Sequence, residues 1–369
     1  MKIPLVDLKA QYLSMKQEID SAIQVIIDNT SFIMGKPVKE FEQHLAEFCG
    51  CKHAIGVSSG SSALFLALKA SGIKEGDEVI TVPNSFIATA EAIIQCGAKP
   101  VFVDVDDKTM LMDPKKIETV ITNKSRAIIP VHLYGQVCDM DAIISIAKKH
   151  NLIIIEDAAQ AIDAEFSGKK IPVHETAIFS FFPAKNLGCY GDGGAVVTNN
   201  DETARLVSKL RDHGRVSKYD SDMIGYGERI DALQAAILSA KLKHLKDWTN
   251  KRREHAHRYN ELFKGSAAIG TPFEDKRCKH VYYMYEIRVK RRDEMMKYLD
   301  ENGIGTGIHY PIPLHLQGAL AYLGHRKGDF PNAERQANEI LSIPMYPELT
   351  EEQIMFVADK IKSFFKEKH

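Results

Sequence analysis

The chain has 369 residues, 44% of them hydrophobic and 26% charged, which is enough for a large core and predicts a second, smaller domain. Lysine and arginine (48) balance aspartate and glutamate (49), and the net charge of -1 gives no electrostatic reason to expect nucleic acid or an anionic membrane as partner. The six cysteines lack zinc-site spacing, and no run reaches the roughly 18 apolar residues of a membrane span. We therefore expect a cytoplasmic protein with reduced thiols, no metal site and a small-molecule partner.

Helical spacing of apolar residues predicts two N-terminal helices, over 12–27 and 38–48, with a break at Gly35 and Pro37. The next stretch, AIGVSSGSSALFLALKASG, is typical of a strand, a small-residue turn and a helix over 62–70. Backbone N–H groups at the start of a helix favour a phosphate, so Gly60 and Ser61 are candidate phosphate ligands. An ordinary serine cap of the helix explains the same residues equally well.

Short apolar runs then alternate with predicted helices. This alternation indicates an α/β fold with a mostly parallel sheet that is covered on both faces and has a crevice at its carboxyl edge. The predicted helices cover 86–95, 114–121 and 140–150, and the predicted strands are EVITV, KPVFVDV, AIIPVHLY, LIIIEDA, AIFSFF and GAVVTN.

Lys185 follows the apolar run 177–182 and Pro183, so we expect it just past a strand end at that carboxyl edge. Partial desolvation lowers the pKa of an amine there and makes it nucleophilic toward a carbonyl. The chemistry that this suggests is a Schiff base with pyridoxal phosphate. A lysine in a loop is more often a solvated surface charge, so Lys185 alone does not decide the question.

Pyridoxal phosphate also needs an acid facing its ring nitrogen, phosphate donors and an apolar or aromatic face. Asp157 closes the strand 152–156 and is the candidate acid, with helix capping as its alternative. Gln160 is placed to bond the ring oxygen, and Ser180 is a further phosphate donor. Phe86, at the predicted start of a helix, is the candidate stacking ring, although core packing is the commoner role.

The remaining sequence predicts a helix over 231–262 that bridges to a second domain. We expect a large domain over 1–249 and a small mixed domain over 250–369, the latter with a strand at 282–290 and helices at 294–302, 332–341 and 351–365. Prolines and glycines exclude a regular element from GIGTGIHYPIPLHLQ. This segment presents His309, Tyr310 and His315 as polar groups for a substrate.

Several motifs together resemble the DegT/DnrJ/EryC1/StrS family of sugar aminotransferases: PLVDLKAQY, GSSAL, EDAAQA, SFFPAKNLGCYGDGGA, RDHGR, RIDALQAAIL and HYPIPLHLQ. The resemblance covers nearly the whole chain and implies the fold type I (aspartate aminotransferase-like) architecture of pyridoxal phosphate enzymes. It implies that Lys185 binds the cofactor covalently and shuttles the proton. It also implies that Asp157 faces the ring nitrogen, Gln160 the ring oxygen, Phe86 the ring face, and Gly60, Ser61 and Ser180 the phosphate.

The resemblance further implies a homodimer whose active sites are shared, with RIDALQAA reaching the other subunit and Arg229 contacting substrate or nucleotide. Gly227 stands where the family usually has a phosphate-binding asparagine, Ile162 and Asp163 replace a common His-Gly pair, and Tyr283 replaces a frequent histidine. Because Lys185 is present, the related dehydratases that carry histidine there are disfavoured.

The run HYPIPLHLQ is similar to members that act at C3 of a nucleotide-linked ketosugar. The function implied is transfer of an amino group from L-glutamate to a 3-keto UDP- or dTDP-sugar, for surface polysaccharide, lipid A or glycoside biosynthesis. Two alternatives stay open: a C4 aminotransferase on a 4-keto-6-deoxy sugar, and a non-catalytic binding or regulatory protein that keeps the fold. The complete set of Lys185, Asp157 and Gln160 argues against the second alternative.

Overall fold

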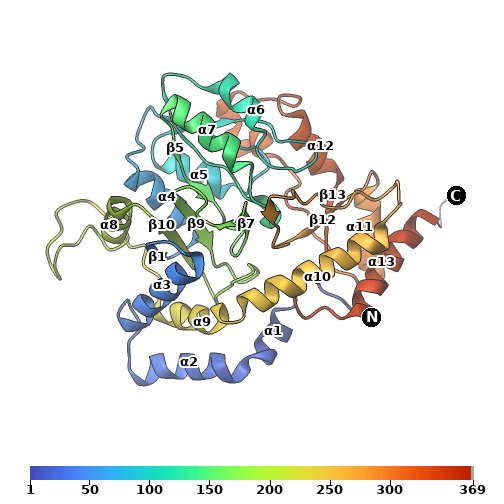
Figure 1. Cartoon of the computed structure of the whole chain (residues 1–369), viewed down its shortest axis with the longest axis horizontal. Coiled ribbons are helices and arrows are strands. Elements are labelled where there is room, and N and C mark those ends of the chain that lie inside the picture. The colour runs from blue at the N-terminus through green and yellow to red at the C-terminus, as the bar shows by residue number, and fades with distance from the viewer. Residues whose placement is uncertain (367–369) are drawn as a thin grey trace.

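One mostly parallel sheet forms the centre of the larger part of the protein; the computed structural model describes residues 1–366 (Figure 1). Strands β5 and β6 are successive pieces of one strand, because Ile155 N donates to Ile128 O on one side and Ala158 N to Ile178 O on the other, both at 3.1 Å. All neighbours are parallel except β10, which runs against both of its neighbours. The resulting order is β1 (His53–Val57), β10 (Gly194–Thr198), β9 (Thr176–Ser180), β6 (Glu156–Asp157) with β5 (Ile153–Ile154), β4 (Ser125–Ile128), β2 (Glu78–Thr81) and β3 (Lys99–Phe102).

Helices cover both faces of this sheet, as the alternation in the sequence predicted. In β9, Ile178 belongs to one hydrophobic core, whereas Ala177 and Phe179 belong to the other, which is the two-residue period of a strand buried on both sides. The helices of one face include α4 and α8, and those of the other include α3 and α9 (Figure 1). The connecting helices are α4 (Gly60–Ala70), α5 (Ala88–Gln95), α6 (Pro114–Ile117), α7 (Met140–His150) and α8 (Asp201–Leu210), with 3-10 turns at Glu118–Val120 and Leu133–Gly135.

The N-terminal helices are α1 (Leu8–Ser14), α2 (Lys16–Asp28) and α3 (Lys36–Cys49). The predicted helix over 12–27 is therefore wrong in detail, because the chain turns at Met15, which caps α2 with φ -132° and ψ 23°. The predicted break is confirmed at Gly35, which has φ 81° and precedes α3, but it is wrong for Pro37, which lies in the first turn of α3. Helices α2 and α3 both pack against α9, so the N-terminal segment supports the helix that follows residue 231.

The long helix predicted over 231–262 is wrong as a single element. It is divided into α9 (Ala232–Leu242) and α10 (Leu245–Phe263), with Lys243 and His244 between them. Neither glycine nor proline marks the break. At the break, the His244 ring stacks on Trp248 of α10, with 5.8 Å between the ring centres, and its Nε2 lies 3.0 Å from Glu18 of α2.

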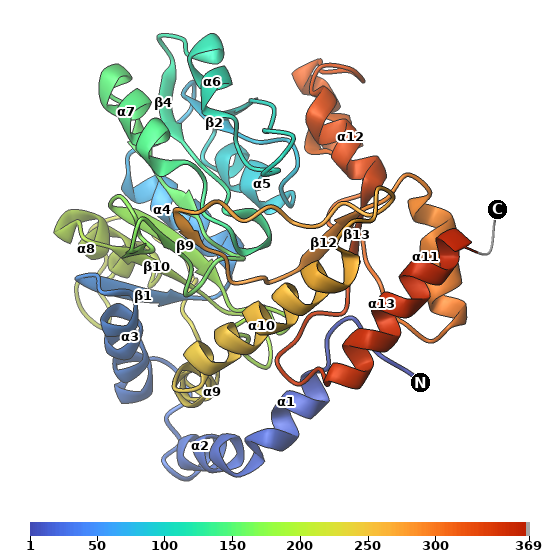
Figure 2. The same cartoon turned by 45° about the vertical axis from the view of Figure 1, so that its right-hand side comes forward.

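The C-terminal part packs around a separate core, and α10 runs between this core and the large sheet (Figure 2). The strand predicted over 282–290 is shorter in the structure and covers Tyr285–Arg288. The helix predicted over 332–341 ends at Glu339, because residues Ile340–Ile343 form a strand that pairs with Tyr285–Arg288. We propose a domain boundary near residue 249. Because Ile3 belongs to the C-terminal core, the first residues of the chain pack with the second domain. The elements are β12 (Tyr285–Arg288), α11 (Arg292–Glu301), α12 (Pro331–Glu339), β13 (Ile340–Ile343) and α13 (Glu351–Lys366), with 3-10 turns at Leu314–Leu316 and Gly318–Leu323.

A small sheet joins the two parts. Strand β7 (Glu165–Phe166) pairs with β8 (Lys169–Lys170) and with β11 (Cys278–Lys279), so residues before and after α10 lie side by side. Within residues 1–366, no helix combines the length and the apolar character needed to cross a bilayer.

Candidate active site

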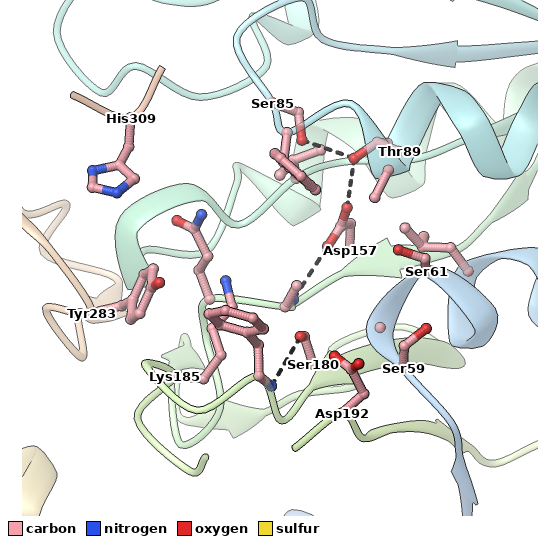
Figure 3. A pocket seen from close by; sticks show the side chains of 18 of the residues that line it. Ser59, Ser61, Ser85, Thr89, Asp157, Ser180, Lys185, Asp192, Tyr283 and His309 are labelled. Carbon is pink, nitrogen blue, oxygen red and sulfur yellow. Dashed lines mark hydrogen bonds between the residues drawn. The ribbon is translucent and has the colours of Figure 1, made fainter. Parts of the chain in front are cut away.

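A cavity of about 420 Å³ lies at the carboxyl edge of the central sheet. Strands β6 and β9 end there, α4 begins there, and the segment around residue 309 closes it from the C-terminal part (Figure 3). The sheet therefore gathers residues that are far apart in the sequence. Those predicted from the sequence that line the cavity are Gly60, Ser61, Phe86, Asp157, Gln160, Ser180, Lys185, His309 and Tyr310.

Lys185 follows β9 in a turn that its own N–H closes by donating to Phe182 O at 2.8 Å. The side chain is open toward the cavity and otherwise surrounded by protein, and its Nζ lies 4.4 Å from the centre of the Tyr283 ring. Burial lowers the pKa of Lys185 to about 8, while the nearby charge of Asp157 acts in the opposite direction. An amine of this kind is neutral in a larger fraction of molecules than a surface lysine, and neutral amine is the nucleophilic form.

Asp157 ends β6 and is 4% exposed, with its carboxylate facing the cavity (Figure 3). Its Oδ2 accepts a hydrogen bond from Thr89 Oγ1 at 2.8 Å, and the Thr89 and Ser85 hydroxyls are also 2.8 Å apart. Its Oδ1 accepts from Ala159 N at 3.2 Å, but no helix follows, so Asp157 is not a helix cap. Burial raises the pKa of Asp157, while the Thr89 bond and the Lys185 charge oppose that rise. A cation placed before this carboxylate would meet a preformed partner.

Gln160 is held on both sides of its amide. Its Oε1 accepts from Tyr134 N at 2.6 Å, and its Nε2 donates to the Tyr310 hydroxyl at 3.3 Å. Tyr134 has φ 61°, a left-handed conformation that tyrosine rarely adopts, and this turns its N–H toward Gln160. The orientation of the Gln160 amide is thereby fixed before any ligand enters.

The start of α4 faces Ser180 across a very short distance. A Cβ at Gly60 would lie 2.6 Å from Ser180 Cβ, so only glycine fits there without displacement. Ser59 caps the helix by accepting from Ser62 N at 3.0 Å, and the N–H groups of Gly60 and Ser61 lie in the first turn, which has no internal acceptors. Ser59 is therefore the residue that caps the helix, and no described residue accepts a hydrogen bond from the N–H groups of Gly60 and Ser61.

The aromatic side chains that line the cavity are Phe86, Phe182, Tyr283 and Tyr310. Phe86 lies just before α5 rather than within it and is 54% exposed, so it is not a core residue. Its ring is 5.6 Å from that of Tyr310 at 39°. The exposed ring is an apolar surface that is open to a planar ligand.

Two of the predicted substrate residues lie outside this cavity. Arg229 forms an ion pair with Asp212. His315 is 2% exposed, with its Nε2 3.0 Å from Glu334 Oε1 and its ring 4.7 Å from Phe330. His315 is a buried histidine with structural contacts, which a proline-rich motif does not distinguish from a ligand-facing one.

The sequence did not single out several residues that line or support the cavity. Thr89 donates a hydrogen bond to Asp157, and Ser85 bonds to Thr89. The available sequence signal was the spacing of these two hydroxyl residues, four positions apart at the start of the predicted helix over 86–95. Asp192 and Ser59 also line the cavity, and the glycine-rich GDGG run was the signal for Asp192. Tyr283, considered only as a departure from the family, lies directly against Lys185.

One departure from the family has a structural account. Asp163, in the place of a common glycine, has φ 68°, a left-handed conformation that aspartate tolerates better than most residues. Its Oδ2 lies 3.1 Å from Lys279 Nζ on the joining sheet. The change thus adds an ion pair between the two parts of the chain.

A half-buried lysine of lowered pKa and a buried carboxylate, at the carboxyl edge of a mostly parallel sheet, define the class: a fold type I, pyridoxal phosphate-dependent aminotransferase. The model of the DegT/DnrJ/EryC1/StrS aminotransferase family matches residues 13–362. The chain belongs to this family.

Individual relatives match over almost their whole length. The chain is 47% identical to a pleiotropic regulatory protein of Geobacillus stearothermophilus, over 99% of both chains. It is 43% identical to a UDP-N-acetyl-3-dehydro-α-D-glucosamine 3-aminotransferase of Acidithiobacillus ferrooxidans, over 98% of this chain and 97% of that protein. The crystal structure of DesV from S. venezuelae superposes with a TM-score of 0.96 at 41% identity, over 98% of each chain.

Proposed function

We propose that this protein transfers an amino group from L-glutamate to C3 of a nucleotide-linked ketosugar, with pyridoxal phosphate as cofactor. The observation that carries the proposal is that Lys185 and Asp157 face one cavity with pKa values displaced by burial. Among relatives, the Acidithiobacillus protein is named for a 3-aminotransferase reaction on a UDP-linked sugar. That name supports C3 as the position and UDP as the nucleotide, with a dTDP-sugar as the alternative.

The residues present fit the cofactor. Asp157 would face the ring nitrogen, Gln160 the ring oxygen and Phe86 the ring face, since all three border the cavity. The close approach of Gly60 to Ser180 leaves a shallow cradle for the phosphate, in which the N–H groups of the first turn of α4 would donate. When bound, the cofactor supplies an electron sink for the carbon that loses a proton.

Lys185 is the residue that moves the proton. With the cofactor bound, the Lys185 Nζ would accept the proton that is lost by the amino-bearing carbon of the donor. In the second half of the reaction the same amine would deliver a proton to C3 of the sugar. A pKa near 8 suits an amine that must accept and release a proton near neutral pH.

We also propose that two copies of the chain form the working enzyme. Large apolar side chains are exposed along the N-terminal helices and the segment after them, which supports burial against a second copy. In that assembly the segment around Arg229 would reach the partner's cavity, which accounts for the position of Arg229 outside its own. The exposed apolar residues are Leu13, Val25, Ile27, Phe32 and Ile33.

The test is amino transfer by purified protein with L-glutamate against 3-keto and 4-keto nucleotide sugars, for the wild type and for Lys185→Ala. We expect turnover with the 3-keto sugar and none in the variant, while Lys264→Ala, at a solvent-exposed turn, keeps wild-type turnover. Full turnover by Lys185→Ala would reject the assignment, and preference for the 4-keto sugar would establish C4 chemistry.

One relative is named as a regulatory protein, so the second candidate is a protein that binds the cofactor without catalysing amino transfer. The two candidates differ in the fate of Lys185. A visible absorption band that appears with pyridoxal phosphate and is bleached by borohydride shows that Lys185 reacts with the cofactor, and its loss on addition of L-glutamate shows amino transfer. A protein that binds the cofactor without either change would be non-catalytic.

A further inference from the structure

His309 belongs to the wall of the cavity, and its two ring nitrogens have different surroundings. Nδ1 lies 2.7 Å from Ser342 Oγ, behind the wall. No described residue hydrogen-bonds Nε2, and the ring borders the cavity on the side opposite the phosphate cradle (Figure 3). The ring also packs tightly, since a Cβ at Gly307 would lie 3.0 Å from His309 Cε1. The ring therefore presents one nitrogen, Nε2, to a ligand.

A buried carboxylate lies behind Ser342. Glu286 in β12 pairs directly with Ser342 in β13, and the Ser342 hydroxyl donates to Glu286 Oε1. Glu286 is 1% exposed, its Oε1 is 3.8 Å from His309 Nδ1, and its Oε2 has no hydrogen-bond partner. No lysine or arginine among residues 1–366 forms an ion pair with it, and the basic group within 4 Å of its carboxylate is the His309 imidazole.

A buried acid in this position is costly. Burial raises the pKa of Glu286, and the interactions with His309 and Ser342 oppose that rise. A cross-strand pair of two apolar residues would pack there without the cost of desolvating a carboxyl group. Stability therefore does not explain the presence of Glu286, whereas the direction of its hydrogen bonds suggests a role for it.

A serine hydroxyl has one proton to donate. When Glu286 is ionised its carboxylate can only accept, so Ser342 donates its proton to Glu286 and the Ser342 oxygen must accept from His309, which places a proton on Nδ1. In a neutral imidazole the other nitrogen then carries a lone pair. We propose that Glu286 and Ser342 are positioning residues that hold His309 with Nε2 as a hydrogen-bond acceptor, and that this acceptor binds a hydroxyl or amide N–H of the sugar substrate.

The inference rests on the proposed function and narrows it. An acceptor nitrogen does not bond to a carboxylate, which has only acceptor oxygens when ionised. His309 in this state therefore discriminates between the two substrates of the reaction: it favours the sugar and contributes nothing to binding the carboxylates of glutamate. We call the hydrogen-bonded series of Glu286, Ser342 and His309 the relay. Breaking the relay should weaken binding of the sugar but not binding of glutamate.

The first test reads the tautomer directly. In holoenzyme labelled with [15N]histidine, two-bond 1H–15N spectra assign the proton to Nδ1 or Nε2, and the His309 signals are those lost in His309→Gln. We expect Nδ1 to be protonated in the wild type, and Ser342→Ala and Glu286→Leu to move the proton toward Nε2. A wild-type proton on Nε2, or an unchanged spectrum in both variants, would overturn the proposal.

The second test compares the two half-reactions through the cofactor's absorbance, with L-glutamate and with UDP-2-acetamido-3-amino-2,3-dideoxy-α-D-glucose as amino donors. We expect the KM for the amino sugar to rise about tenfold in each variant, as for loss of one hydrogen bond, and the KM for glutamate to stay within about twofold. Equal increases for both donors would refute selective positioning.

Glu339→Gln is the matched control. Glu339 ends α12 next to β13, and its carboxylate bonds to Arg288 rather than to the relay, so neither readout should change. The NMR result does not require turnover of the sugar. Failure of the wild type to use this amino sugar would thus reject a UDP-linked 3-amino sugar as its substrate, whereas a wrong tautomer would reject the relay alone.

Discussion

Replacing Gly60 by alanine tests whether the start of α4 and the end of β9 form the phosphate cradle. The new Cβ would lie 2.6 Å from Ser180 Cβ and 3.2 Å from Ser180 Cα, whereas carbon atoms in contact are normally about 3.5–4.0 Å apart. One element must therefore move by nearly an ångström. In an open helix the same change would be favourable by up to about 1 kcal/mol, so the clash decides the sign.

Overpacking of this size costs about 1–3 kcal/mol. Because the displaced N–H groups are those proposed to bind the phosphate, we expect the Kd for pyridoxal phosphate to rise about 5-fold to 150-fold. The measurement is a titration of apoenzyme followed by absorbance, together with thermal unfolding. Gly318→Ala is the control, since Gly318 has no atom within 4 Å of its Cβ position and should bind the cofactor normally.

A double-mutant cycle isolates the clash from other effects of the substitution. Ser180→Gly removes the atom that the new Cβ at position 60 would strike, so Gly60→Ala should cost far less in that background than in the wild type. Equal costs in both backgrounds would refute steric contact as the cause. Unchanged cofactor affinity in Gly60→Ala would refute the cradle itself.

Three further outcomes are expected. The rate at which apoenzyme captures pyridoxal phosphate should rise with pH and level off above about 8, because the neutral amine of Lys185 accumulates above its lowered pKa. Asp157→Asn should move this pH profile to lower pH, since the Asp157 charge raises the pKa of Lys185. A rate that continues to rise beyond about pH 10 would contradict both expectations. Thr89→Val removes a donor to Asp157 and should raise the pKa of that acid and lower kcat about tenfold without altering thermal unfolding, so full activity would show that the bond is dispensable. Lys241→Met removes a buried amine that donates to Gly188 O at 2.7 Å, so amide hydrogen exchange over residues 186–191 should accelerate, and unchanged exchange would show that other contacts hold this loop.

The sequence was sufficient for the sheet and for most residues of the cavity because both depend on local patterns. Apolar runs alternating with amphipathic helices specify parallel strands, and polar residues at the ends of such runs must meet at one edge. Lys185 and Asp157 each come shortly after an apolar run, and the structure places both at one cavity. Gly60 was predicted from its turn, and its contact with Ser180 shows why that turn needs glycine.

What the sequence did not predict depends on contacts between distant segments. The break between α9 and α10 has no glycine or proline to mark it, and β13 continues directly from a helix. His309 and His315 share one proline-rich run, yet one borders the cavity and the other is bonded to Glu334. The pairing of Glu286 with Ser342 joins residues 56 positions apart. No local pattern specifies such meetings.

The reversed direction of β10 has a consequence for how this enzyme can change. Because β10 returns beside β9, with Gly194 opposite Ser180, the segment that carries Lys185 is the closed end of a hairpin anchored in the middle of the sheet. The wall around His309 comes from a separate stretch, attached to other strands. Mutation can therefore remodel which sugar is accepted while the reactive amine keeps its place, and we expect divergence of substrate range within such proteins to concentrate in the stretch around residues 303–317.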